Sequence, residues 1–361
     1  MSQPLETVES AAAAELAVVT RSGFVESRHV GSAVVVEPDG AVSRRLGDPD
    51  ALLFPRSTLK PFQAIAAMKA GAPLVGAQVA IAAGSHTGSL EHMRTAAGML
   101  AAAGLSPKDL RCPPAWPKDE DARDRLRERG EGKQALAMNC SGKHAAFLWA
   151  CAVRGWDTAS YLDPDHPLQR LVLETVQEFT GDAPALVGVD GCGAPLPAIT
   201  LTGLARGYAR LGAAIRNIGE DARTATLATA MVDYPEMVQG HGEPNTVVIE
   251  GLDVIAKLGA EGVLCVATPQ GAAAAVKVLD GSSRPATLTA LTLLAGAGHL
   301  PGAAVEAVLG KILHPITGGG EPVGAMIRLG AAFDDAEQGS GDADQGFADA
   351  GQAADDAGQE A

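Results

Sequence analysis

The sequence predicts an α+β domain whose first and last segments share one β-sheet. Short runs rich in valine and isoleucine lie near both ends of the 361-residue chain, whereas the middle carries apolar residues at helical spacing. Strands gathered at both ends with helices between them are typical of α+β domains. Hydrophobic residues make up 47% of the chain, which is enough for a substantial core.

Seven short runs have the composition of β-strands. They are residues 17–19, 32–37, 41–45, 78–83, 263–267, 273–279 and a last run near 323–328. Pro38, Asp39 and Gly40 supply the turn of a first hairpin. The runs 263–267 and 273–279 form a second hairpin, and the short apolar run 78–83 is expected to be a buried strand.

The first helix is located by a proline. Pro61 has no amide hydrogen and is tolerated only in the first turn of a helix, so this helix begins at about Ser57 or Thr58 and stops at Gly71. Further helices are expected at residues 91–103, 143–154, 167–179, 201–211, 220–232 and 288–295. The proline-rich residues 112–117 predict a stiff loop, and the densely charged residues 118–133 predict a solvated flap or surface helix.

Composition divides the chain into three parts. We expect a flexible N-terminus over residues 1–15, a single domain over residues 16–333 and a disordered acidic tail over residues 334–361. The tail holds nine acidic residues and no lysine or arginine, so the formal charge of −15 falls to −6 without it. The chain without this tail is mildly acidic, which argues against nucleic acid or an anionic membrane as a partner.

The cysteines and the N-terminal residues indicate a reducing compartment. The five cysteines are an odd number without the spacing of a disulfide framework. The first residues carry glutamates and no basic residue before their apolar run, which makes a poor secretion signal. No run approaches the length of a membrane span. The expected location is the cytoplasm.

The stretch FPRSTLKPF, residues 54–62, places a possible nucleophile beside a possible base. Ser57 and Lys60 are three residues apart and share a face at a helix N-terminus. A serine hydroxyl becomes nucleophilic when a neighbouring base accepts its proton. Lysine can act so only if its pKa falls from about 10.4 toward neutrality, through burial, the helix N-terminus and a second ammonium. In the alternative interpretation, Ser57 only caps the helix and Lys60 is an ordinary solvated side chain.

Lys257 is the candidate for the second ammonium. It precedes Leu258 and Gly259, so the order of Ser57-x-x-Lys60 and Lys257-x-Gly259 matches the S-x-x-K and K-x-G motifs of serine penicillin-binding enzymes and β-lactamases. The S-D-N motif of those enzymes is absent. The segment GSHTGS, residues 84–89, could take its place, with Ser85 hydrogen-bonded to Lys257.

Two cysteine-containing turns raise the question of a metal. Cys140-x-x-Lys143 and Asp190-x-Cys192 would bring two thiols, an amine and a carboxylate together if the turns meet. Structural zinc usually takes four cysteine or histidine ligands, so spacing alone favours two small buried cysteines over a metal site.

Five ordered motifs carry a family resemblance. RSTLKP, SHTG, NCSGKH, VDGCG and AKLGAEG, spread over most of residues 16–329, resemble the class 3 L-asparaginases, the rhizobial-type asparaginase II family. The resemblance implies a fold like that of serine β-lactamases and penicillin-binding proteins, with a central, mostly antiparallel sheet, flanking helices and a helical subdomain. It also implies hydrolysis of the side-chain amide of L-asparagine to L-aspartate and ammonia, and a homodimer.

The same resemblance implies roles for individual residues. Ser57 would be the nucleophile and Lys60 its base, with Ser85 and Lys257 as a second serine–lysine dyad. The substrate-binding residues expected on this basis are Arg56, His86 and Asp190, with Asp190 facing the α-amino group and Arg56 the carboxylate. A zinc site would be formed by Cys140, Lys143 and Cys192, which reverses the expectation from spacing alone.

Other functions remain open at this stage. A glutaminase or another serine amidohydrolase would share the serine–lysine apparatus, and one methylene in a small pocket is worth only about 1 to 3 kcal/mol of discrimination. A penicillin-recognising hydrolase fits a cytoplasmic location poorly. A catalytically inactive, zinc-stabilised binding protein is the alternative from a different class.

Overall fold

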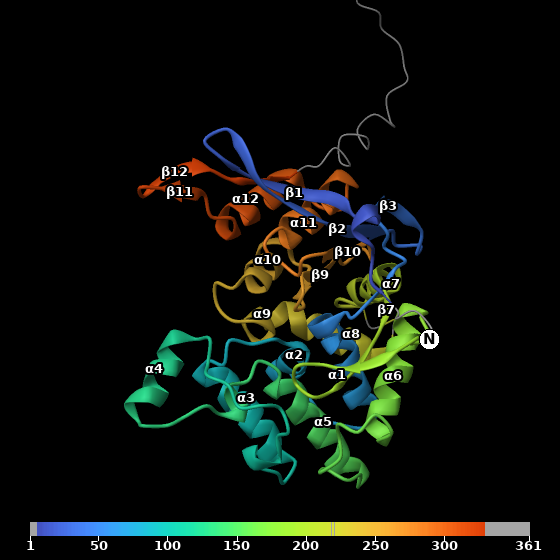
Figure 1. Cartoon of the computed structure of the whole chain (residues 1–361). Helices are drawn as coiled ribbons and strands as arrows, with labels where there is room; N and C mark the ends of the chain where they lie inside the picture. Colours follow the sequence, from blue (N-terminus) through green and yellow to red (C-terminus); the bar gives the residue numbers. More distant parts are fainter. Residues whose placement is uncertain (1–5, 218, 220, 329–361) are drawn as a thin grey trace, which may run out of the picture.

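The computed structural model describes residues 6–217, 219 and 221–328, and its largest sheet has seven strands (Figure 1). The strands follow the order β13-β1-β2-β10-β9-β8, with β3 pairing on β2, and every pairing is antiparallel. Their bounds are β1 Ala14–Arg21, β2 Phe24–Val36, β3 Val42–Leu46, β8 Ile255–Leu258, β9 Val263–Ala267, β10 Ala273–Val278 and β13 Met326–Arg328. Ala17 of β1 lies opposite Arg328 of β13, so the first and last segments share one sheet as predicted.

Both predicted hairpins are confirmed. The chain turns between β2 and β3 at residues 38–40, where the Glu37 amide donates to the Ala41 carbonyl at 2.8 Å and Gly40 has a φ of 86°. The β9–β10 pair brings Ala273 opposite Ala267. Three short pairs lie outside the large sheet: β4 Leu52–Leu53 with β7 Ile199–Thr200, β5 Val187–Val189 with β6 Pro195–Pro197, and β11 Ile316–Gly318 with β12 Glu321–Gly324.

Helices cover the sheet and form a second region beside it. The α-helices are α1 Lys60–Lys69, α2 Ala77–Ala83, α3 Leu90–Ala102, α4 Glu120–Glu128, α5 Ser141–Arg154, α6 Pro167–Thr180, α7 Leu201–Ala213, α8 Ala222–Asp233, α9 Pro235–Val238, α10 Pro244–Leu252, α11 Ala286–Gly296 and α12 Gly302–Ile312. Helices α7 and α11 both pack on β9 and β10, and every residue of β10 is buried. Helices α1 to α6 gather below the sheet in Figure 1. Within the described residues, no helix has the length and apolar character needed to span a bilayer.

The prediction of a strand at residues 78–83 is wrong. These residues belong to α2, whose last five residues, Val79 to Ala83, are all buried. A helix that is buried on every side lacks the polar face that gives an amphipathic helix its period. A short, wholly apolar run can therefore be either a buried helix or a buried strand. The other predicted helices are present with bounds that differ by a few residues. The expected start of α8 at Glu220 and the predicted acidic tail lie outside the described residues.

Several elements have no counterpart in the sequence prediction. Helices α10 and α12 and strand β8 were not predicted, and β8 proves important because it carries Lys257. Strand β1 begins at Ala14, slightly earlier than the expected start of the domain at residue 16. The charged segment 118–133 contains the surface helix α4, in agreement with the prediction.

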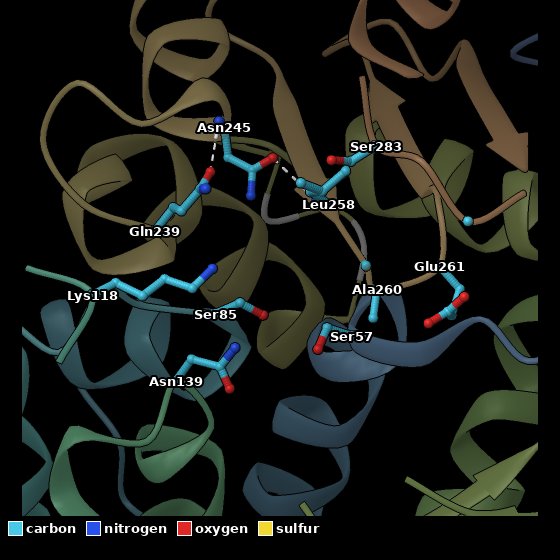
Figure 2. Close-up of a pocket in the computed structure, with 12 residues that line it drawn as sticks. Ser57, Ser85, Lys118, Asn139, Gln239, Asn245, Leu258, Ala260, Glu261 and Ser283 are labelled. Atoms are coloured by element: carbon cyan, nitrogen blue, oxygen red, sulfur yellow. Dashed lines mark hydrogen bonds between the residues drawn. The ribbon is translucent and has the colours of Figure 1, made fainter. Parts of the chain in front are cut away.

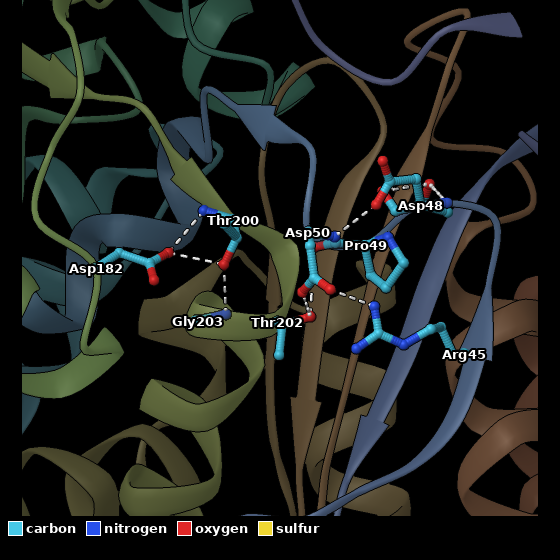
Figure 3. Close-up of polar contacts among 9 residues, drawn as sticks. Arg45, Asp48, Pro49, Asp50, Asp182, Thr200, Thr202 and Gly203 are labelled. Carbon is cyan, nitrogen blue, oxygen red and sulfur yellow. Dashed lines mark hydrogen bonds and ion pairs between the residues drawn. The ribbon is translucent and has the colours of Figure 1, made fainter. Parts of the chain in front are cut away.

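A polar network fixes the start of α7 against the loop that follows β3 (Figure 3). Thr200 caps α7, because its Oγ1 accepts a hydrogen bond from the Gly203 amide at 2.9 Å. Asp182 Oδ2 accepts from both the amide and the hydroxyl of Thr200, each at 2.7 Å. Two residues further along the chain, the Thr202 hydroxyl donates to Asp50, which also pairs with Arg45. The network joins three segments that are distant in sequence.

Replacing Thr200 with alanine should destabilise the fold without touching the pocket described below. The substitution removes the cap of α7 and leaves Asp182 with fewer donors, so we expect the free energy of unfolding to fall by about 1 to 2 kcal/mol. Urea unfolding followed by circular dichroism measures the change. Thr226→Ala is the control, because Thr226 is exposed on α8 and bonds only within its own helix. Equal losses in the two variants would contradict the capping role.

Candidate active site

A tight turn presents Ser57 at the N-terminus of α1. A 3₁₀ turn, η2 Arg56–Leu59, runs directly into α1, and the Lys60 amide donates to the Ser57 carbonyl. Arg56 has a φ of 54°, in the left-handed region that residues with a side chain rarely adopt. Gly259 packs on this turn so closely that a Cβ there would lie 2.9 Å from the Pro55 carbonyl oxygen. The helical turns thus begin at Arg56, close to the predicted start at Ser57 or Thr58, whereas the α-helix itself begins at Lys60.

Ser85 lies in an extended segment that follows α2. Its amide donates to the Val238 carbonyl at 2.7 Å, and the His86 amide donates to the Asn139 carbonyl at 3.2 Å. Gly84 precedes it in a position where a Cβ would lie 2.4 Å from the Met237 carbonyl oxygen. Backbone contacts on two sides therefore fix where the Ser85 hydroxyl points.

Two buried lysines meet at the Ser85 hydroxyl. Lys60 Nζ lies 2.8 Å from Ser85 Oγ, and Lys257 Nζ, reaching from β8, lies 2.9 Å from the same oxygen. Lys60 also donates to the carbonyls of Gly84 and Asn139, and Lys257 to that of Leu258. The side chains of Lys60 and Lys257 are 1% and 0% exposed. Ser85 thus forms one hydrogen-bonded group with both amines.

The pairing differs from the expected Ser57–Lys60 dyad. Both residues are described, and no hydrogen bond joins the Ser57 hydroxyl to the Lys60 amine, because that amine is turned toward Ser85 and two backbone carbonyls. The expected contact between Ser85 and Lys257 is present. Ser57 and Ser85 line the same pocket. The structure therefore brings the four predicted residues together, with Ser85 rather than Ser57 next to the amines.

Burial favours the uncharged form of both lysines. Desolvation is the largest cause that lowers the pKa of Lys60 below its ordinary 10.5. Desolvation, followed by the charge of Lys60, lowers the pKa of Lys257 well below the same value. Two amines that share one hydroxyl disfavour each other's protonation. A neutral amine next to a hydroxyl can accept its proton.

The pocket in front of Ser57 and Ser85 has a volume of about 270 Å³ and mostly polar walls. Figure 2 shows the two serines in the middle, Lys118 on the left and Glu261 on the right. Other polar side chains on its walls are those of Asn139, Gln239, Asn245 and Ser283. Its size and polarity suit a small polar molecule.

Arg56 and Asp190, expected to bind the two charges of the substrate, are paired with each other. Arg56 Nε donates to Asp190 Oδ1 at 2.8 Å, and neither residue is among those that line the pocket. Although burial acts in the opposite direction, Lys143 and Arg56 lower the pKa of Asp190 below its usual range. The pair lies beside η2 and holds the Arg56 side chain next to the strained start of the turn.

His86 is turned away from the pocket. Its ring is buried, Nδ1 accepts from the Gly88 amide at 3.1 Å and Nε2 lies 2.9 Å from the Ser141 hydroxyl. Since Nδ1 is the acceptor, Nε2 carries the proton of a neutral ring. Desolvation, with the nearby rings and amines, lowers the pKa of His86 well below 6.5. His86 therefore supports the Ser85 segment from behind.

The two cysteine-containing turns meet next to Lys60. Lys143 Nζ donates to Cys192 Sγ at 3.1 Å, and Cys192 lies 3.6 Å from Asp190 Oδ2. A hydrogen bond from Cys192, together with Lys60 and Lys143, lowers the pKa of Cys140 well below 9.0. Burial would lower the pKa of Lys143, but the two thiols outweigh it and raise that pKa. The five cysteines are free and buried.

The donor set of this cluster is compatible with a thiophilic metal. Among the described residues, no three His, Cys, Asp or Glu side chains are grouped as a metal site. The two thiols would therefore need a nitrogen donor as a third ligand, and Lys143, which is in contact with one of them, could serve once a metal displaces its proton. His144 is a further nitrogen donor. Burial lowers its pKa, and Cys192 and Lys143 are near enough to act on that pKa as well. Its buried Nε2 has no geometric hydrogen-bond partner in the described part of the chain. Sulfur and nitrogen ligands suit zinc.

Sequence reasoning missed six polar residues of the pocket: Lys118, Asn139, Gln239, Asn245, Glu261 and Ser283. Glu261 belongs to the motif AKLGAEG, which could have pointed to it, and Gln239 lies in the segment YPEMVQG, residues 234–240. Lys118 lies at the start of the charged segment that was predicted to be a solvated flap or surface helix. Asn245 carried no signal, because α10 itself was not predicted.

The fold and the site together point to the class of hydrolytic enzymes. Two serine hydroxyls in one polar pocket, one of them between buried amines, are typical of enzymes that transfer acyl groups through a serine. The sequence matches the family model of L-asparaginase II over residues 17–328, so the chain belongs to the L-asparaginase II family of amidohydrolases. No curated protein matched the chain.

Proposed function

We propose that this protein is an L-asparaginase that hydrolyses the side-chain amide of L-asparagine to L-aspartate and ammonia through a serine. The observation that carries the proposal is the Ser85 hydroxyl held between the buried amines of Lys60 and Lys257, beside Ser57 in a small polar pocket. Family membership supports an asparaginase-type reaction. The related fold that we infer is that of serine β-lactamases, which the antiparallel sheet with flanking helices supports.

In the proposed reaction, Ser57 Oγ attacks the carbonyl carbon of the side-chain amide. Its proton passes through the Ser85 hydroxyl to a neutral lysine, which removes the need for a direct contact between Ser57 and Lys60. Backbone amides at the start of α1 stabilise the oxyanion. The amide nitrogen takes up the proton and leaves as ammonia, and an aspartyl ester remains on Ser57. Water then attacks this ester and restores the free hydroxyl.

We propose zinc as a resident metal, held by Cys140, Lys143 and Cys192. The contact between Lys143 and Cys192 and the unpartnered Nε2 of His144 support a sulfur and nitrogen donor set. The metal would supply positive charge next to the Arg56–Asp190 pair. Cys140→Ser and Cys192→Ser should each lower the zinc content of the purified protein to background, as measured by plasma mass spectrometry. Unchanged zinc in both variants would exclude this site.

We also propose that the protein is a homodimer and that it prefers asparagine to glutamine. Size-exclusion chromatography with light scattering tests the homodimer. The two alternatives are a preference for glutamine and a binding protein without turnover. The pocket favours the shorter amide only through its small volume, so a direct comparison of substrates is needed.

Ammonia release from L-asparagine and from L-glutamine, measured in parallel, tests the proposed function. We expect kcat/KM to be higher for asparagine by about 10-fold or more, because each methylene is worth about 1 to 3 kcal/mol in a small pocket. Wild-type protein prepared with and without a chelator shows whether turnover depends on metal. A higher kcat/KM for glutamine would favour a glutaminase, and metal binding without turnover of either amide would favour a binding protein.

A further inference from the structure

One wall of the pocket carries two nitrogen donors that the protein itself does not satisfy. Asn245 lies at the start of α10, and Lys118 precedes α4; the two residues are far apart in sequence. Both line the same pocket as Ser57 and Ser85. In Figure 2 both side chains lie in the left half of the view, across the pocket from Glu261.

The orientation of the Asn245 carboxamide is fixed. Its Oδ1 accepts from the Leu258 amide at 3.1 Å, and because that partner is a donor, the oxygen and not the nitrogen must face it. The backbone amide of Asn245 donates to Gln239 Oε1 at 2.9 Å, which fixes the start of the helix as well. Asn245 is 2% exposed, and Nδ2 has no hydrogen-bond partner among residues 6–217, 219 and 221–328.

A buried amide nitrogen without an acceptor is uncommon in folded proteins. The cost of leaving it unpaired is recovered if a bound molecule supplies an oxygen at this position. Asn245 Nδ2 therefore indicates a ligand with an acceptor on this wall.

Lys118 supplies a positive charge on the same wall. Its backbone is anchored, because its amide donates to the Thr87 carbonyl at 2.8 Å, two residues beyond Ser85. The neighbouring carboxylate of Asp119 is occupied by the Ala122 amide, which it caps at 2.8 Å. No salt bridge to the Lys118 ammonium is present within the described part of the chain. Lys118 is the cationic side chain among the described residues that line this pocket.

Three other basic side chains near the site are already engaged. Arg56 is paired with Asp190 and lies outside the pocket lining. Lys60 and Lys257 are buried behind Ser85 and bond to it. An anionic group that enters the pocket therefore meets Lys118 first.

We propose that Asn245 and Lys118 bind the α-carboxylate of the substrate, and that they limit the substrates to free α-amino acids. The inference rests on the proposed amidohydrolase function. A carboxylate has two oxygens and can accept from an amide and an ammonium at once, and such charge-assisted hydrogen bonds are the stronger ones. A neutral side-chain amide gains less from Lys118 and is left to face Ser57 and Ser85.

A comparison of L-asparagine with its α-methyl ester tests the inference by kinetics. The ester removes the charge but keeps the side-chain amide. Wild-type protein should prefer L-asparagine by about 10- to 100-fold in kcat/KM, the range of one hydrogen bond to a charged group. Lys118→Met should remove most of this preference by lowering kcat/KM for asparagine alone. Asn245→Asp keeps the acceptor for Leu258 but replaces the donor with a negative charge, so it should reverse the preference toward the ester.

Lys133→Met is the matched control. Lys133 lies in the same charged segment as Lys118, is exposed and is not part of the pocket lining. This variant should keep the wild-type ratio of the two substrates. A loss of the same size for asparagine and for the ester in Lys118→Met would overturn the inference, because it would indicate a general structural role.

Titration calorimetry with L-aspartate separates this inference from the proposed function. Wild-type protein and Lys133→Met should bind L-aspartate equally, and Lys118→Met should bind it about 10-fold or more weakly. Protein that hydrolyses neither asparagine nor glutamine but shows this dependence on Lys118 would refute the proposed function and keep the carboxylate site. Equal binding by Lys118→Met and wild type, or no binding by wild type, would overturn the inference.

Discussion

Ser57→Ala should lower kcat for asparagine hydrolysis by about 10⁴-fold or more, because loss of a serine nucleophile removes the covalent route altogether. Ser85→Ala should cost about 10²- to 10⁴-fold, the usual range for a group that transfers protons. Ammonia release measures both. Rapid acid quench followed by mass spectrometry of the intact protein should detect an aspartyl adduct in Ser85→Ala and none in Ser57→Ala.

The adduct assigns the nucleophile independently of the rates. Both variants keep the backbone contacts that position their segments, so circular dichroism and thermal unfolding should resemble those of the wild type. Ser283→Ala is a matched control, since Ser283 lines the same pocket but bonds to neither lysine. An adduct that persists in Ser57→Ala and disappears in Ser85→Ala would transfer the nucleophilic role to Ser85.

Lys257→Met should abolish most activity and at the same time change how stability depends on pH. Burial, with the charge of Lys60, lowers the pKa of Lys257 well below 10.5 in the folded protein. Between that lowered pKa and 10.5 the unfolded chain holds a proton that the folded chain lacks, so the free energy of unfolding rises as the pH rises. We expect a smaller rise in the variant and a loss of kcat of about 10²- to 10⁴-fold.

The activity should also depend on the protonation of the buried lysines. In the wild type, kcat/KM should fall on acidification, because a protonated lysine cannot accept the proton of a serine. Urea unfolding at several pH values and initial rates over about pH 5 to 9 provide the two measurements. Lys108→Met, at an exposed position, should match the wild type in both. A flat rate over this pH range would contradict a lysine base, whatever the behaviour of the variant.

The sequence predicted the main architecture because a helix or strand with one buried face repeats its apolar residues at a characteristic period. This prediction failed for elements that are buried on all sides, where the period disappears. Val79 to Ala83 are buried on all sides, so α2 carried no amphipathic pattern and was interpreted as a strand. Strand β8 is only four residues long, too short for alternation to identify it.

The site was predictable as a set of motifs but not as a set of contacts. Ser57, Lys60, Ser85 and Lys257 were each identified from spacing and resemblance, and all four lie together. The partner of Lys60 depends on where the amine points after the Ser85 segment has packed between Val238 and Asn139. Asn245 could not be found in this way, since its importance arises from an unpaired nitrogen that only three-dimensional packing creates.

The Ser85 hydroxyl joins Lys60 to Lys257, and the second contact spans 172 positions of the chain. During synthesis on the ribosome, the residues that carry Ser57, Lys60 and Ser85 are all translated before Lys257 and strand β8. Until then Ser85 has one amine instead of two. A nascent chain therefore cannot begin turnover early, and the appearance of activity should report that β8 has docked on the growing sheet.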